Sequence, residues 1–146
     1  MIKLPISETS TFNKELPLSK TEAKSYSSLT LAFLGDCVYE NLVRQRVLLE
    51  GTHTKKLHEK SVSKVRASYQ AAGARLLEES DLLSNEESDV LRRGRNAKST
   101  VPKSAKVADY KLATGLEALF GYLTLIGENE RVKNLFEHIY NGGKLV

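Results

Sequence analysis

The sequence lacks most of the features that mark exported, membrane-bound or disulfide-stabilised proteins. It has one cysteine, Cys37, no tryptophan and three prolines among 146 residues. A single cysteine excludes an intramolecular disulfide and a zinc site built on cysteine pairs. No run approaches the roughly 20 apolar residues that cross a bilayer, and the N-terminus has no apolar signal core, so we expect a cytoplasmic protein without a membrane partner. Two prolines lie in residues 1–18, which we expect to form an irregular arm before a single domain at 19–146.

The alternation of apolar and polar residues that marks a half-buried strand is also missing, whereas helical patterns are frequent. Two serines, Ser19 and Ser84, are each followed three residues later by glutamate and have the form of helix-opening capping boxes. The patterns together predict an all-α fold of about six or seven helices. The first expected helix opens at Ser19, and the second covers 28–49. A short helix from Thr54 is followed by a longer one that ends at about 79. The last three are expected at 84–94, 106–126 and 129–140.

Two acidic residues stand in helical segments that are otherwise apolar. Asp36 is the only charge within residues 29–38, and Glu117 is the only charge within residues 116–123. Helices as apolar as these are expected at the centre of a fold. A lone ionised carboxylate there costs several kcal/mol unless a cation or strong hydrogen-bond donors compensate it. We therefore expect each carboxylate to have a specific partner.

Small residues accompany both acids. Gly35 precedes Asp36, and around Glu117 small residues recur at every third position: Gly115, Ala118 and Gly121. Glycine inside a helix costs roughly 0.5–1 kcal/mol relative to alanine, and a close approach of the two helices is a good reason for it. Such an approach would bring the two carboxylates to one point, where a divalent cation with oxygen ligands would compensate their charges.

The same residues also permit an ordinary structural explanation. Each acid can pair with an arginine, for which Arg44 and Arg75 are available, or can cap a neighbouring helix. Glu40 lies one turn after the aspartate, where it can support the site or form an ion pair with Arg44. Thr114 lies one turn before the glutamate, and its hydroxyl can bind a metal-ligated water or bond to its own helix backbone. The pattern alone leaves these alternatives open.

A basic segment lies between the two acids. Residues 92–111 carry seven lysines and arginines against one acid, Asp109. Such a segment attracts polyanions, although an isolated basic cluster is equally compatible with a solvated loop. Pro102 and the surrounding polar residues predict that this segment forms a loop at 95–103.

Three motifs, taken in order, resemble those of a known family. Leu-Gly-Asp at 34–36, followed by Cys37 and Val38, resembles the signature helix of ribonuclease III. Glu-Ala-Leu-Phe-Gly at 117–121 resembles the second acidic motif of that family. Between them, the run at 92–99 with Val-Pro-Lys at 101–103 is similar to the hallmark of the mini-ribonuclease III branch. The resemblance covers about residues 28–140.

This resemblance implies a dimeric, Mg²⁺-dependent endoribonuclease that cuts both strands of double-stranded RNA and leaves 5′-phosphates; Mn²⁺ is expected to substitute. It implies that Asp36 and Glu117 are catalytic and bind the metal. The expected task is maturation of ribosomal RNA precursors of the 23S type, with a ribosomal protein or an assembling ribosomal subunit as a further partner. The apolar face from Leu29 to Val38 is the candidate dimer interface.

The RNA contacts are expected to fall on the basic segment, because duplex RNA is read mainly through its phosphates and 2′-hydroxyls. The expected RNA-binding residues are Arg92, Arg93, Arg95, Asn96, Lys98, Lys103 and Lys106. The chain departs from full-length ribonuclease III at three acidic positions, here Leu29, Ala32 and Thr114, so water would fill more of the metal's coordination shell. About five residues follow Asn141, and we expect no separate RNA-binding domain.

Two other functions compete with the nuclease. One is an RNA-binding module of the same fold that no longer cuts, and the other is a helical adaptor with an incidental basic face. The presence of both Asp36 and Glu117 favours the nuclease. His58 and Lys60 are expected at the surface or in packing, without a catalytic role, and Cys37 is expected to be a small buried thiol.

Overall fold

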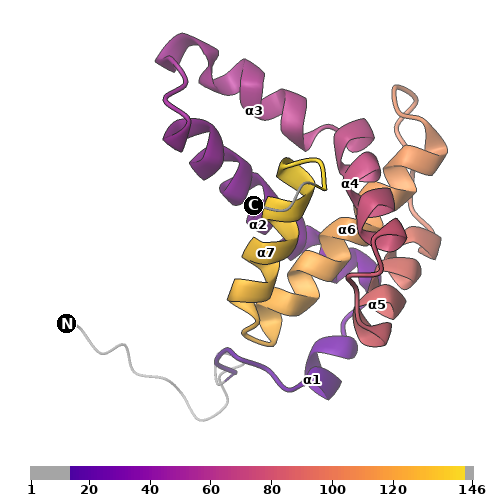
Figure 1. Ribbon diagram of the computed structural model, residues 1–146. Coiled ribbons are helices and arrows are strands. Elements are labelled where there is room, and N and C mark those ends of the chain that lie inside the picture. Colours follow the sequence, from indigo (N-terminus) through magenta and orange to yellow (C-terminus); the bar gives the residue numbers. More distant parts are fainter. Residues whose placement is uncertain (1–13, 144–146) are drawn as a thin grey trace, which may run out of the picture.

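The computed structural model describes residues 14–143, and this range is helical without strands (Figure 1). The helices are α1 Lys20–Lys24, α2 Ser28–Leu49, η2 Thr54–Lys56, α3 Leu57–Val65, α4 Ala67–Glu79, α5 Asn85–Asn96, α6 Val107–Leu125 and α7 Asn129–Tyr140; η2 is a single 3-10 turn. The predicted all-α fold is confirmed. No helix in the described part of the chain is long and apolar enough to cross a membrane.

Both predicted capping boxes are present. The backbone N–H of Glu22 donates to Oγ of Ser19, and the N–H of Glu87 donates to Oγ of Ser84, each over 3.1 Å. Each glutamate in turn accepts from the backbone of its serine, which satisfies two otherwise unpaired donors at each helix start. Gly51 has a positive φ of 76° directly after the end of α2, a conformation that glycine adopts without steric cost. Local sequence signals therefore set these boundaries.

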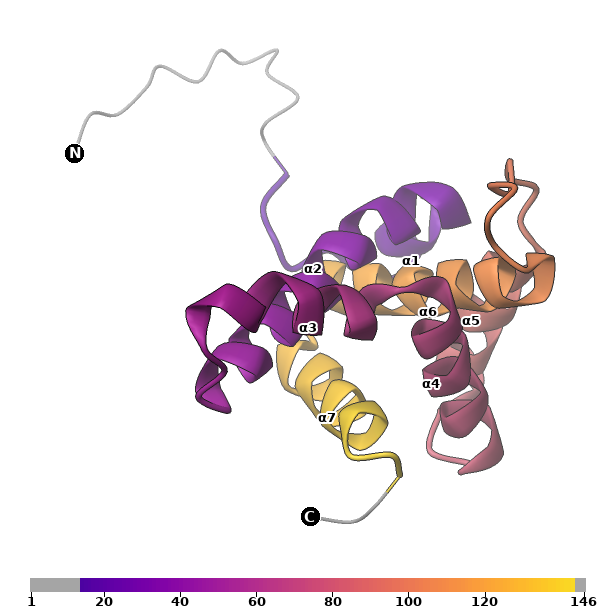
Figure 2. The ribbon, with the colours of Figure 1, turned by 90° about the horizontal axis from the view of Figure 1, so that it is seen from above.

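Helix α6 lies at the centre of the fold, with α2, α4 and α5 packed around it (Figure 1, Figure 2). Most of its residues are buried, which explains its apolar composition. Phe120 of α6 and Phe136 of α7 flank Tyr39 of α2, with ring centroids 5.8 and 5.7 Å from that of Tyr39. This aromatic cluster joins three helices that are far apart in the sequence.

Helix α5 extends further than the sequence predicts. The prediction ends this helix near Gly94, but the helix continues through Asn96, so the loop covers 97–106 and not 95–103. A Cβ at Gly94 would lie 2.8 Å from Cα of Gly115 and 2.9 Å from Cβ of Ala118. The glycine therefore serves close packing of α5 on α6 and does not end the helix.

The junction between α3 and α4 is tied to the core by two side chains. The Tyr39 hydroxyl donates to the carbonyl of Lys64 over 2.8 Å, and Nε2 of Gln70 donates to the carbonyl of Val65 over 2.7 Å. Both carbonyls belong to the last turn of α3. These bonds fix the point at which the hairpin of α2 and α3, which projects from one side of the molecule in Figure 1, returns to α4.

The described part of the N-terminal segment, 14–18, is not helical and runs against the C-terminal end of α6. Its Leu18 is buried, and the N–H of Leu18 donates to the carbonyl of Leu125 over 2.7 Å. The rest of the arm that the sequence predicts, residues 1–13, lies outside the described residues.

Candidate active site: two carboxylates at a close helix crossing

Helices α2 and α6 cross at backbone contact. A Cβ built on Gly35 would lie 1.6 Å from the carbonyl oxygen of Glu117, and one built on Gly121 would lie 1.9 Å from the carbonyl oxygen of Leu31. No side chain fits at either position, so both glycines are required by the crossing. Asp36 follows the first glycine, and the crossing places it beside Glu117. The geometry agrees with the close helix approach predicted from Gly35 and Gly121, whereas Gly115 and Ala118 pack against α5 and not α2.

The electrostatics of the two carboxyl groups reflect this proximity. Burial, followed by the negative charge of Asp36 and a hydrogen bond between the two groups, raises the pKa of Glu117 to about 8. In the absence of a cation, Glu117 therefore holds a proton at neutral pH. Asp36 is exposed, whereas Glu117 is half-buried. The expectation of a buried carboxylate thus holds in part for the glutamate and is wrong for the aspartate.

The two arginines that could have neutralised these acids are engaged elsewhere. Arg44 pairs with Glu40 over 3.0 Å, and Arg75 pairs with Asp109 over 3.0 Å. Within residues 14–143, neither carboxylate of the crossing has a lysine, arginine or histidine nitrogen within 4.0 Å. The alternative in which each acid pairs with an arginine is therefore absent from the described structure.

The two residues considered as supports of the site have ordinary structural contacts. Glu40 forms the exposed ion pair with Arg44, one turn along α2. The Thr114 hydroxyl donates to the carbonyl of Tyr110 in its own helix over 3.0 Å. Such bonds back to the helix backbone are common for buried threonine, so neither contact by itself indicates a role at the carboxylates.

The donor set at the crossing suits a hard divalent cation. Its ligands would be carboxylate oxygens from Asp36 and Glu117, and ions such as Mg²⁺ combine one or two carboxylates with several waters. Among the described residues, no three or more His, Cys, Asp or Glu side chains are grouped to hold a metal. The two carboxylates would therefore leave most of the coordination shell to water and substrate oxygens.

The structure divides the predicted RNA-binding residues into two groups. The three arginines on α5 have acidic neighbours: Arg92 and Arg93 contact Asp89, and Arg95 lies 3.5 Å from Glu78. The pairs with Asp89 follow the helical spacing of three and four residues, a signal already present in the sequence. The remaining residues lie at the end of α5 or in the following loop, are exposed, and have no ion pair among the described residues: Asn96, Lys98, Lys103 and Lys106.

The N-terminal half of α2 exposes an apolar stripe beside Asp36. Leu29, Phe33 and Cys37 follow one another at four-residue steps and are all exposed, and Phe33 is 83% exposed. Exposure of Cys37 contradicts the predicted buried thiol. The sequence pattern predicts that this part of α2 is buried on all sides, because its core-facing residues and its outward-facing residues are both apolar.

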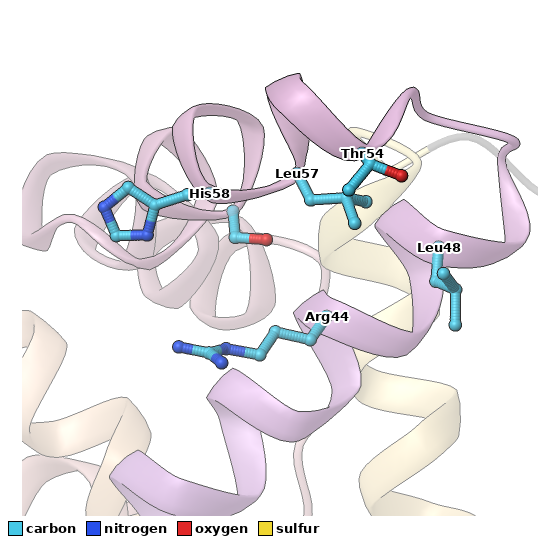
Figure 3. Close-up of a pocket in the computed structure, with 6 residues that line it drawn as sticks. Arg44, Leu48, Thr54, Leu57 and His58 are labelled. Carbon is cyan, nitrogen blue, oxygen red and sulfur yellow. The ribbon is translucent and has the colours of Figure 1, made fainter.

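A separate cavity of about 390 Å³ opens between α2 and α3 (Figure 3). Figure 3 shows Arg44 extending from α2 toward the side on which His58 lies, with Leu57 close to Thr54. Neither carboxylate of the crossing lines this cavity. His58 is exposed, as the sequence predicts, and is not part of the carboxylate site.

Comparison with known proteins identifies the class to which this fold belongs. A family model described as "Ribonuclease III domain" matches residues 29–128. The chain belongs to the ribonuclease III family, whose members are endoribonucleases. Asp36 and Glu117 both lie within the matched residues.

The relatives identify the branch within this family. A protein named "Mini-ribonuclease 3" from a Thermoanaerobacter species is 46% identical over 127 residues, which cover 86% of this chain and 87% of that protein. One of the same name from Gloeobacter violaceus is 49% identical over 108 residues, covering 74% and 78%. A crystal structure of a Fusobacterium nucleatum protein superposes with a TM-score of 0.74 at 32% identity, covering 84% of this chain and 98% of that one. The mini-ribonuclease III resemblance is thereby confirmed.

The crossing yields a prediction about stability. Gly35→Ala forces a Cβ into the backbone of α6 and should lower the free energy of unfolding by about 3 kcal/mol or more, because backbone atoms cannot turn aside. Gly73→Ala is the matched comparison, with a smaller loss expected, since the three atoms nearest to its Cβ all belong to the Ile139 side chain (Cγ2 at 2.7 Å) and none to a backbone. Urea unfolding of both variants measures the difference. Equal losses would contradict the rigid contact at the crossing.

The raised pKa of Glu117 predicts a pH dependence of stability in the presence of a chelator. The folded chain holds this proton up to about pH 8, whereas the ordinary pKa of the group is 4.5. This contribution to stability is therefore complete below pH 4.5 and is lost as the pH rises through about 8. Relative to Glu117→Gln, the parent should lose up to a few kcal/mol of unfolding free energy across this range. If urea titrations show that the difference in unfolding free energy between the parent and Glu117→Gln does not change with pH, the raised pKa of Glu117 is excluded.

Proposed function

We propose that this endoribonuclease cleaves double-stranded RNA in a reaction that depends on Mg²⁺ held by Asp36 and Glu117. The observation that supports this most directly is the pair of carboxylates joined by the crossing, which has no cationic neighbour among the described residues. Mg²⁺, when bound, lowers the pKa of a coordinated water and stabilises negative charge on phosphate oxygens. We expect Mn²⁺ to substitute, because it prefers the same oxygen ligands.

The residues of the chain perform distinct tasks in this proposal. Asp36, exposed at the surface, faces the incoming phosphodiester, and Glu117 behind it must release its proton before it can act as a ligand. The rigid contact of α2 with α6 fixes the separation of the two groups without a flexible loop. The exposed lysines Lys98, Lys103 and Lys106 provide positive charge for the RNA backbone. The products would carry 5′-phosphates, as the resemblance implies.

The second element of the proposal is a homodimer. An aromatic ring as exposed as that of Phe33 gains roughly 1.5–3 kcal/mol when it is buried, and Leu29 and Cys37 extend the same stripe. The stripe lies beside Asp36, so a dimer in which two chains pack through α2 would contain two neighbouring carboxylate sites. A twofold axis would match the two antiparallel strands of a duplex, with one site for each strand.

The natural substrate that we propose within this class is a stem of a ribosomal RNA precursor of the 23S type, with a ribosomal protein or an assembling ribosomal subunit as a partner. This assignment rests on the family resemblance and on no feature of the site. The two competing functions, a non-cleaving RNA-binding module and an adaptor, differ from the nuclease in their response to divalent metal.

Cleavage of a labelled RNA duplex tests the catalytic proposal. We expect the purified protein to cut both strands with Mg²⁺ and neither with excess chelator. Asp36→Asn should lower the rate by at least about 100-fold, because the cation supplies several kcal/mol of charge stabilisation. Asp81→Asn makes the same chemical change at an exposed turn whose φ of 54° asparagine tolerates, and should cut normally. Binding without cleavage by the parent, across several duplexes with Mg²⁺, would leave only the RNA-binding module.

The dimer has a separate test. Phe33→Asp places a charge in the proposed interface and should convert the dimer to a monomer at micromolar concentration, as measured by sedimentation equilibrium. Leu49→Asp is the matched control, since Leu49 is 80% exposed at the opposite end of α2. A parent that sediments as a monomer, or a Phe33→Asp variant that remains dimeric, would exclude pairing through this stripe.

A further inference from the structure

A second cavity, of about 580 Å³, lies between the start of α4 and the loop at 97–106. Arg66 and Ser68 line it on the α4 side, and Ser104 and Lys106 line it on the loop side. Segments separated by some 40 residues in the sequence therefore form its two walls. The wall that carries Arg66 is anchored, because the carbonyls of the two preceding residues accept the hydrogen bonds from Tyr39 and Gln70.

The charge of this cavity is positive. Arg66 and Lys106 are both exposed, and within residues 14–143 neither has an aspartate or glutamate within 4.0 Å. The one acid in the lining, Asp109, is neutralised by Arg75 over 3.0 Å, and its side chain is only 17% exposed. By contrast, the arginines of α5 all have acidic neighbours. The positively charged side chains of Arg66 and Lys106 and the two serine hydroxyls can together bind a phosphate group.

One wall of the cavity is formed by the start of α6, the helix that carries the catalytic glutamate. Tyr110, which also lines the cavity, precedes Glu117 by seven residues, and Lys106 precedes it by eleven. With 3.6 residues per turn, Tyr110 lies two turns before Glu117 on the same side of the helix, and Lys106 is the N-cap residue at which the helix starts. The distance from Tyr110 to Glu117 along the helix axis is about 10.5 Å at 1.5 Å per residue. An RNA strand covers such a distance within a few nucleotides.

We propose that this cavity is a phosphate-binding subsite of the RNA-cleaving site, in which Arg66 and Lys106 hold the backbone of the strand that is cut at Asp36 and Glu117. The proposal rests on the proposed function and adds to it a positioning residue, Arg66, outside the basic segment of the sequence. The strand spans the distance between the carboxylates and the cavity. Contacts to phosphate set the register of the strand and carry no sequence information.

The salt dependence of RNA binding tests this subsite. Binding of a fluorescent RNA duplex is measured by anisotropy over a range of KCl concentrations with excess chelator, so that no cutting occurs. Each phosphate contact that is lost should reduce the slope of log K against log salt by about 1. We expect this reduction for Arg66→Gln and for Lys106→Gln, and about twice that reduction for the double variant. Arg66→Lys keeps the charge and should retain the slope of the parent.

Control variants and kinetics separate this role from general charge effects. Lys133→Gln removes one positive charge from the exposed face of α7, where Lys133 neighbours Glu130, and should leave the slope unchanged. With Mg²⁺, Arg66→Gln should raise KM and keep kcat within about twofold of the parent, because the contact is the same before and during the reaction. Unfolding midpoints equal to that of the parent show that the fold is retained.

The possible failures are distinguishable. The parent could bind and cut duplex RNA while Arg66→Gln and Lys106→Gln show the same slope of log K against log salt as the parent. In that case the proposed subsite is wrong and the proposed function stands. An equal loss of slope in Lys133→Gln would also overturn the subsite, because it would show a dependence on net charge alone. If the parent does not bind duplex RNA at any salt concentration, both proposals fail together.

Discussion

The close crossing of α2 and α6 is the constraint on which the rest of the structure depends. Contact between backbones at Gly35 and Gly121 leaves no space for a side chain, so the two helices cannot approach each other any further at this point. Asp36 adjoins the first of these glycines, and Glu117 lies one turn before the second. The contact that packs the two helices therefore also sets the separation of the two carboxyl groups.

The surrounding helices make this crossing possible. Helix α6 is covered by α4 and α5 as well as α2, and Gly94 allows α5 to approach Gly115 closely, although less closely than α2 approaches Glu117. A helix held from three sides can carry a half-buried acid whose protonated form is favoured, because the packing of its other residues supplies the stability. The same arrangement directs the end of α5 and the loop at 97–106 toward the N-terminal half of α6, where positive charge gathers.

Much of this structure could be predicted from the sequence, because its signals are local. Capping serines, helical periodicity and the glycines beside two isolated acids were sufficient for the fold class, most boundaries and the joining of α2 to α6. Features that depend on tertiary contact were not accessible: Gly94 remains helical because of its neighbour across the interface, and Arg66 faces the loop only once α4 is placed. The burial of Cys37 was predicted wrongly because an apolar pattern does not distinguish residues of the core from exposed residues such as Phe33.

The different environments of the two carboxyl groups explain how the crossing can exist with and without a cation. Two ionised carboxylates side by side would repel each other. Glu117, the half-buried one, avoids this repulsion by holding a proton, as the rise of its pKa to about 8 indicates. A carboxylate must be deprotonated to act as a metal ligand, so binding of a cation at this crossing would release the proton. The affinity for such a cation would therefore increase with pH below about 8, and the half-buried Glu117 would be neutralised either by its proton or by the cation.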